Sequence, residues 1–109
     1  MSEAISFGKA LTTTNTTLLT VPASTTRYIT QVQVCNVDGT NDADVTISWT
    51  DSSDSDTEYR LAYQITVAAK DSRTMLAGSF AMNAGDTLKG LSSADGDLEV
   101  VVTYYDEAV

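Results

Sequence analysis

The sequence predicts an all-β protein built as a single antiparallel β-sandwich of about eight strands, jelly-roll-like or immunoglobulin-like. Three observations predict this class. Short stretches alternate apolar and polar residues with the period of two that a half-buried strand requires. Turn residues separate these stretches at a spacing of roughly ten residues. Finally, no stretch repeats apolar residues at helical spacing over several turns.

The most regular alternation lies between residues 28 and 50. Val45, Ile47 and Trp49 occupy alternate positions there, so they share one face of a strand and are expected in the core. The segment 36–42 separates this strand from an earlier alternating stretch, and its Asp-Gly and Asn-Asp pairs tolerate positive φ. We therefore predict a hairpin in which the two strands pair with each other.

Weaker patterns place the other strands. Residues 4–11 alternate loosely, with Ile5 and Phe7 on one face. We interpret residues 1–11 as an N-terminal arm or edge strand of one domain that spans residues 1–109. The apolar-free segment 51–58 is expected to be an exposed loop that connects two strands and is dispensable for folding. Further strands are expected at residues 17–21, 59–67, 72–77, 79–82 and 87–91.

The strongest single strand is expected at residues 98–105, after a turn at residues 92–97 that we interpret as a second hairpin. Val100 and Val102 lie on the face of this strand that is predicted to point into the core. The last residues, 106–109, begin with the charged pair Asp106 and Glu107, so we expect a frayed terminus.

Charge limits the partners that this chain can have. Acidic residues outnumber Lys and Arg by 15 to 6, which gives a net charge of -9. Nucleic acid is excluded as a natural partner because phosphates are neutralised by Lys and Arg. An anionic membrane surface is disfavoured for the same reason, and no stretch approaches the roughly 20 apolar residues of a membrane span. A basic protein surface is a compatible partner.

Cys35 is the sole cysteine, so no disulfide can form within the chain. We interpret it as a buried thiol, because free cysteine behaves as a small apolar core residue. This fits a protein that is made in a reducing host cytoplasm. The N-terminus has neither a basic region nor an apolar run, so no signal peptide is expected.

An acidic turn holds the one candidate for a metal site. Asp38, Asp42 and Asp44 carry oxygen ligands suited to Ca²⁺, although their spacing is not that of an EF-hand loop, and a solvated turn is the alternative. Ser-His and Cys-His nucleophile pairs are absent because the chain has no histidine. Paired carboxylates of the glycosidase kind need a cleft, whereas these acids concentrate in turns. We predict no enzyme activity and no cofactor.

Tyrosines offer a second kind of candidate site. Tyr is rigid and amphipathic, so it serves in protein interfaces and in sugar-binding platforms, and it also lines the margins of sandwich cores. Together with the weakly alternating N-terminal segment, the tyrosines give a predicted interface set of Ile5, Phe7, Tyr28, Tyr59, Tyr63 and Tyr105.

Two stretches of the chain resemble small β-sandwich virion proteins of tailed bacteriophages. The first is the Gly-Asp turn within residues 84–88, followed at residues 97–107 by a closing strand that is rich in Val and ends in Tyr and Glu. The second is residues 29–37, followed by residues 43–49. Together they cover most of residues 28–107.

This resemblance implies a non-enzymatic structural protein. Within the family, the chain is most similar to capsid decoration (cement) proteins, which implies a homotrimer on the outer capsid surface that bridges subunits of the major capsid protein. Tail, baseplate or fibre accessory proteins of the phage are the alternative, and a carbohydrate-binding module is a further one. The family supplies no catalytic residues to carry over.

Overall fold

The computed structural model describes residues 3–109, apart from the side chain of Ala77. This part of the chain contains eight strands and one short 3-10 turn, η1 (Ser52–Asp54). The strands are β1 (Ile5–Ala10), β2 (Thr16–Thr20), β3 (Thr25–Asn36), β4 (Ala43–Asp51), β5 (Thr57–Val67), β6 (Ser72–Met82), β7 (Thr87–Ser92) and β8 (Leu98–Ala108).

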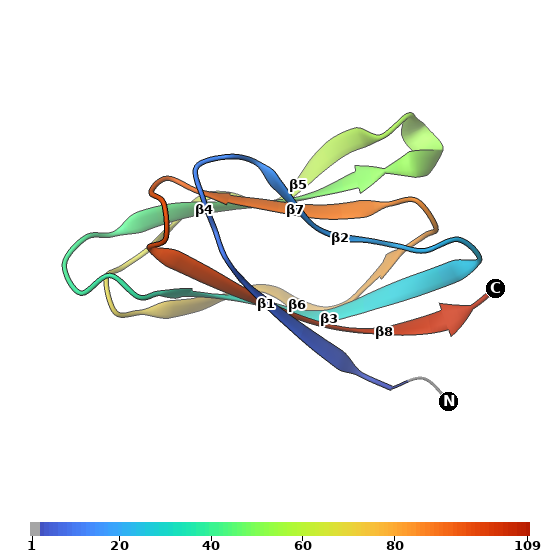
Figure 1. Cartoon of the computed structure of the whole chain (residues 1–109), viewed down its shortest axis with the longest axis horizontal. Coiled ribbons are helices and arrows are strands. Elements are labelled where there is room, and N and C mark those ends of the chain that lie inside the picture. Colours follow the sequence, from blue (N-terminus) through green and yellow to red (C-terminus); the bar gives the residue numbers. More distant parts are fainter. Residues whose placement is uncertain (1–2) are drawn as a thin grey trace.

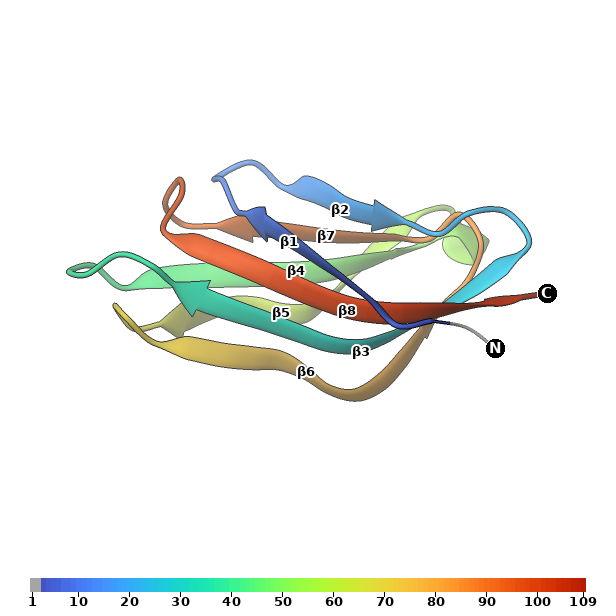
Figure 2. The ribbon, with the colours of Figure 1, turned by 60° about the horizontal axis from the view of Figure 1, so that its bottom comes forward.

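The strands form two four-stranded sheets that lie in two layers (Figures 1 and 2). Sheet A has the order β1-β8-β3-β6, and sheet B has the order β2-β7-β4-β5. Every pairing is antiparallel and the pairs are nested, with β1 on β8, β2 on β7, β3 on β6 and β4 on β5. This nesting is the jelly-roll arrangement. The predicted all-β sandwich is confirmed, and the jelly roll is the form that it takes.

The core lies between the inward faces of the two sheets. Val45 and Ile47 on β4, and Val100 and Val102 on β8, have no exposed surface. Complete burial of a side chain of this size contributes about 1.5 to 3 kcal/mol. Other fully buried side chains are Leu11, Val21, Ile29, Val32, Val34, Val67, Met82, Leu88 and Leu98.

Trp49 lies at the margin of the core and is only partly buried, because it is near the end of β4. Its ring meets Phe80 of the opposite sheet edge-on, with 5.3 Å between the ring centroids. The indole Nε1 donates a hydrogen bond to Asp86 Oδ2 at 3.0 Å. Trp49 therefore packs against the core, on the face that it shares with Val45 and Ile47, but at one end of the core and not in its middle.

The predicted hairpin between β3 and β4 is wrong, because these strands belong to different sheets. The connection crosses from sheet A to sheet B, and the buried Asn36 holds it in place. Asn36 Nδ2 donates to the carbonyl oxygens of Asn41 (3.0 Å) and Val67 (2.9 Å), and its Oδ1 accepts from the Asp38 N–H (2.9 Å).

A second crossing replaces the hairpin predicted at residues 92–97, since β7 lies in sheet B and β8 in sheet A. Residues 93–97 form a turn, as the sequence predicts, but local sequence does not say whether the next strand joins the same sheet. Of the strands adjacent in the chain, β4 and β5 are the two that pair across a tight connection, through η1.

The predicted fraying of residues 106–109 is also wrong. Strand β8 continues to Ala108, and the Val109 N–H donates to the Ser24 carbonyl at 3.0 Å. Asp106 forms an ion pair with Arg27, 2.7 Å apart between Oδ1 and Nε. Backbone pairing as far as Ala108 and the Asp106 ion pair hold this end of β8 to β3.

At the other end of the chain, β1 lies at the edge of sheet A and pairs on one side with β8. Leu11, directly after β1, is 1% exposed and enters the core between the sheets. Both termini lie at the same end of the sandwich (Figure 1).

Candidate functional site

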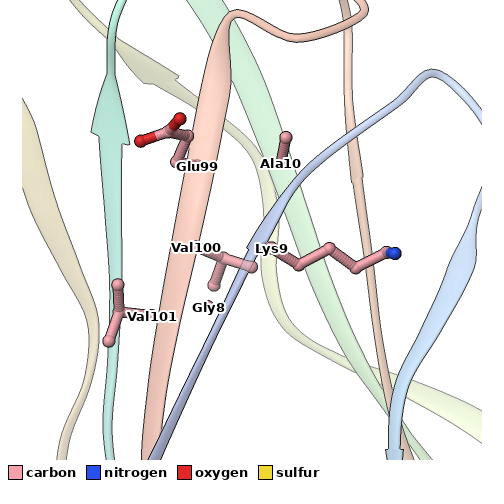
Figure 3. A pocket seen from close by; sticks show the side chains of 6 residues that line it. All are labelled: Gly8, Lys9, Ala10, Glu99, Val100 and Val101. Carbon is pink, nitrogen blue, oxygen red and sulfur yellow. The ribbon is translucent and has the colours of Figure 1, made fainter.

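A shallow depression lies between β1 and β8, and Figure 3 shows the side chains that line it. Its charged side chains, Lys9 and Glu99, extend in different directions from it (Figure 3). Backbone and short side chains make up most of the rest, so no set of polar groups converges on one point. Its lining residues are Gly8, Lys9, Ala10, Glu99, Val100 and Val101. The outer surfaces of the sandwich are therefore better candidates for a functional site.

Tyr28 and Tyr105 stack on the outside of sheet A. They are register partners on β3 and β8, and their ring centroids lie 5.0 Å apart with 21° between the planes. Both rings are partly buried. A stacked pair of this kind is stabilised beyond its buried area and has little freedom, which suits an anchor in an interface.

Tyr59 and Tyr63 lie on β5, the edge strand of sheet B, and are 46% and 60% exposed. The Tyr59 hydroxyl donates to Asp54 Oδ2 at 2.7 Å, and this bond raises the pKa of Tyr59. The Arg60 guanidinium lies 5.7 Å from the centre of the Tyr63 ring. The predicted tyrosines are thus divided between the two sheets and do not form one platform.

The two apolar candidates from the N-terminal segment have different surroundings. Ile5 is 45% exposed, opposite Tyr104. Phe7 lies opposite Val102 and packs against the core. Ile5 is available to a partner, whereas Phe7 holds the edge strand to the sandwich.

The three candidate calcium ligands do not converge, since each carboxylate accepts a hydrogen bond from a different part of the chain. No group of three or more Cys, Asp or Glu side chains within residues 3–109 is arranged to hold a metal ion. The bonds are Asp38 Oδ1 with Thr40 N (2.9 Å), Asp42 Oδ1 with Ala69 N (3.1 Å), and Asp44 Oδ1 with Thr66 Oγ1 (2.8 Å).

Asp86 is a buried polar centre that sequence reasoning missed. It is 1% exposed and accepts hydrogen bonds from Trp49 Nε1, Asn83 N (2.8 Å), and Ser52 N (2.8 Å) and Oγ (2.7 Å). Burial alone raises the pKa of Asp86, but the bonds from Ser52, Asn83 and Trp49 outweigh it and the pKa is lowered. The sequence marks Asp86 as part of a Gly-Asp turn, but its partners Trp49 on β4 and Ser52 in η1 are distant in sequence.

This network gives partners to both ends of residues 51–58, which the sequence predicts as an exposed loop between two strands. Ser52 anchors its start through Asp86. Glu58 anchors its end, where its carboxylate accepts from Ser48 Oγ (2.5 Å) and Asn15 Nδ2 (3.0 Å). Residues 53–56 between these anchors are exposed, as predicted.

Arg27 is a second buried polar group that the sequence pattern did not reveal. Its guanidinium donates to both carboxylate oxygens of Asp106, at 2.7 and 2.9 Å. The same group lies 4.0 Å from the centre of the Tyr104 ring. The bond to Asp106 raises the pKa of Arg27, and the bond to Arg27 lowers the pKa of Asp106. Both contacts fasten the end of β8 to β3.

The outer face of sheet A is formed by the side chains that its strands direct away from sheet B. On this face, Glu99 and Glu107 lie near the two ends of β8, and the outward-facing register partners between them are uncharged; the charged partners Arg27 and Asp106 alternate with these. Cys35 belongs to this face and is exposed, because it alternates with the buried Val34. The prediction of a buried thiol is wrong. The central side chains of this face are Tyr28, Gln31, Gln33, Val101, Thr103 and Tyr105.

The outer face of sheet B has a different character. Ser48 lies between Lys89 on β7 and Arg60 on β5, so charged side chains cross this sheet. Glu58 adds a carboxylate, and its bond to Ser48 lowers the pKa of Glu58. The two sides of the sandwich therefore present different chemistry.

Comparisons with known proteins show what the fold is similar to. No protein-family model matches the chain, and no curated protein sequence is similar enough to count as a relative. In the part of the chain that the structure describes, no helix is long and apolar enough to span a membrane.

Solved structures of two kinds have a similar fold. The first belongs to Bacillus endospore appendages described as disulfide-linked pili, with 20% identity, a TM-score of 0.57, and coverage of 100% of this chain and 88% of that chain. The second belongs to the acid-stable capsid of Helicobacter pylori bacteriophage KHP30, with 11% identity, a TM-score of 0.56, and coverage of 96% and 86%. At these identities the likeness shows that this chain has the same kind of β-sandwich fold.

Proposed function

We propose that this chain is a structural, non-enzymatic protein of a bacteriophage virion that decorates the capsid. The observation that supports this most is that the jelly roll, over 96% of its length, is similar to a chain in a phage capsid. The resemblance of residues 84–88 and 97–107 to phage β-sandwich virion proteins points the same way.

The mechanism in this proposal is adhesion. A rigid sandwich bridges neighbouring subunits of the major capsid protein on the outer surface of the virion, after synthesis in the host cytoplasm. The net charge of -9 favours a basic patch on the capsid. An interface of about 1,200 to 2,000 Å² is enough for stable attachment, and a homotrimer slows dissociation because its contacts are multivalent.

A subunit of an extracellular filament is the second candidate, and it rests on the likeness to Bacillus endospore appendages over the whole chain. A phage tail or fibre component shares this feature of repeated assembly. A carbohydrate-binding module receives less support, because the exposed tyrosines are divided between two sheets.

The deciding experiment is quantitative mass spectrometry of purified phage particles, combined with cryo-electron microscopy of the same particles. A copy number comparable to that of the major capsid protein, with density on the outer capsid, is expected for a decoration protein. A copy number far below it indicates a tail component. Absence from particles, together with recovery in extracellular fibres, would contradict the capsid role and favour the filament.

A further inference from the structure

We propose that the outer face of sheet A is covered by a second copy of this chain when the protein assembles. The inference rests on the proposed structural role only in that such a protein self-associates. It goes beyond that role because it assigns the contact to one of the two sheet faces.

The side chains of this face are those of an interface. Val101, at its middle, is 47% exposed although it is apolar. The stacked Tyr28 and Tyr105 lie nearby on the same two strands. In Figure 2, β1, β8, β3 and β6 run side by side on the near side of the molecule, with no loop across them. Tyrosine enrichment and depletion of charge are features of interface cores.

Charge identifies the occupant. A basic partner would be attracted most strongly to acidic surfaces, which this chain carries in its loops and turns. Its electrostatic attraction to an uncharged sheet face would be weak. A second copy also has a net charge of -9, so its close approach is least unfavourable over the part of the surface that carries no carboxylates. The uncharged region between Glu99 and Glu107 meets this condition.

The size of the face is also sufficient. Four strands about 4.8 Å apart and about 30 Å long give a face of roughly 600 Å² before side-chain relief is counted. A stable interface buries about 800 Å² on each partner. The face of sheet A with its margins reaches this range, so a second copy seated on it forms a contact of ordinary size.

The test places one new carboxylate on each sheet of the full chain. Val101→Glu adds it to the outer face of sheet A, and Thr17→Glu adds it to the outside of sheet B, opposite Lys89. Sedimentation velocity over a concentration series should show self-association weakened at least about 100-fold by Val101→Glu, because the added carboxylate would be buried against the second copy without a partner. Thr17→Glu should associate like the unmodified protein, and circular dichroism checks that both variants fold.

Cys35 supplies a second measurement on the unmodified protein. As the sole cysteine, and on this face, it should react with a maleimide quickly in dilute monomer and about tenfold or more slowly in the assembly, because a contact covers it. Equal reactivity in both forms, equal weakening by the two Glu variants, or a wild-type chain that stays monomeric would each overturn the inference. None of these results bears on the copy number in particles, so the two proposals fail separately.

Discussion

Asp86 joins three segments that are distant in sequence, since its carboxylate accepts from Trp49 on β4, Ser52 in η1 and Asn83 before β7. We expect Asp86→Asn to lower the free energy of unfolding at neutral pH by about 2 to 3 kcal/mol, because an amide presents a donor to these donors. In a domain of this size the thermal midpoint should fall by roughly 10 to 20 °C. Exposed Asp56→Asn is the matched control.

The difference in stability between the wild type and Asp86→Asn should depend on pH, because the pKa of Asp86 is lowered in the folded protein. An unfolded Asp titrates near pH 3.9, so the ionised carboxylate stabilises the fold fully above about pH 4 and this contribution is lost as the pH falls through the folded-state pKa. The gap in thermal midpoint between the wild type and Asp86→Asn should therefore narrow below about pH 4. A gap that stays constant to pH 2 would show that the charge of Asp86 is not what stabilises the turn.

Arg27 uses the shape of its guanidinium as well as its charge. It forms two parallel bonds with Asp106 and lies over the Tyr104 ring. Arg27→Lys keeps the charge but loses the two parallel hydrogen bonds to Asp106 and the planar contact with the Tyr104 ring. We therefore expect the free energy of unfolding, measured by chemical denaturation, to fall by about 1 to 2 kcal/mol. Arg60→Lys, at an exposed position, should change stability far less. Equal effects of the two substitutions would mean that charge alone holds the end of β8.

Residues 51–58 divide into two anchored ends and an exposed tip, residues 53–56, in which Asp54 accepts an exposed hydrogen bond from the Tyr59 hydroxyl. Replacing residues 53–56 with a Gly-Ser linker of equal length should leave the thermal midpoint nearly unchanged, because these residues are exposed and loop closure costs little. Extending the replacement to Ser52 should cost about 1 to 2 kcal/mol through the lost bonds to Asp86. If the tip replacement alone destabilises the protein strongly, the exposed residues have a partner that the fold does not explain.

Strand β4 shows how far the sequence predicts this fold. Alternation placed Val45 and Ile47 in the core, because a period of two is a local property of a strand. It did not identify the sheet that β4 joins, since that depends on Asn36 reaching Val67 across the sandwich. The same limit applies to Asp86, because its partners Ser52 and Trp49 lie 34 and 37 residues away in the sequence. Residue type favours burial of Cys35, but its alternation with the buried Val34 decides its position and exposes it.

The whole molecule combines a strongly acidic charge with one sheet face that carries little of it. In dilute salt, long-range repulsion between copies of charge -9 opposes self-association, whereas attraction to a basic capsid patch favours attachment. The Debye length falls from about 30 Å at 0.01 M salt to about 3 Å at 1 M. Both long-range forces are screened over that range, but the apolar and aromatic contacts of the sheet face are not.

Salt should therefore separate the two kinds of contact. Self-association, measured by light scattering, should stay constant or strengthen as salt rises from about 0.01 M to about 1 M, whereas attachment to purified capsids, measured by co-sedimentation, should weaken. Val101→Glu should abolish self-association and leave the salt-sensitive attachment to capsids, because the acidic loops are unchanged. The opposite result, in which high salt dissociates the self-assembled form while capsid attachment persists, would contradict this arrangement. Opposite charges would then join the copies, and an uncharged surface would bind the capsid.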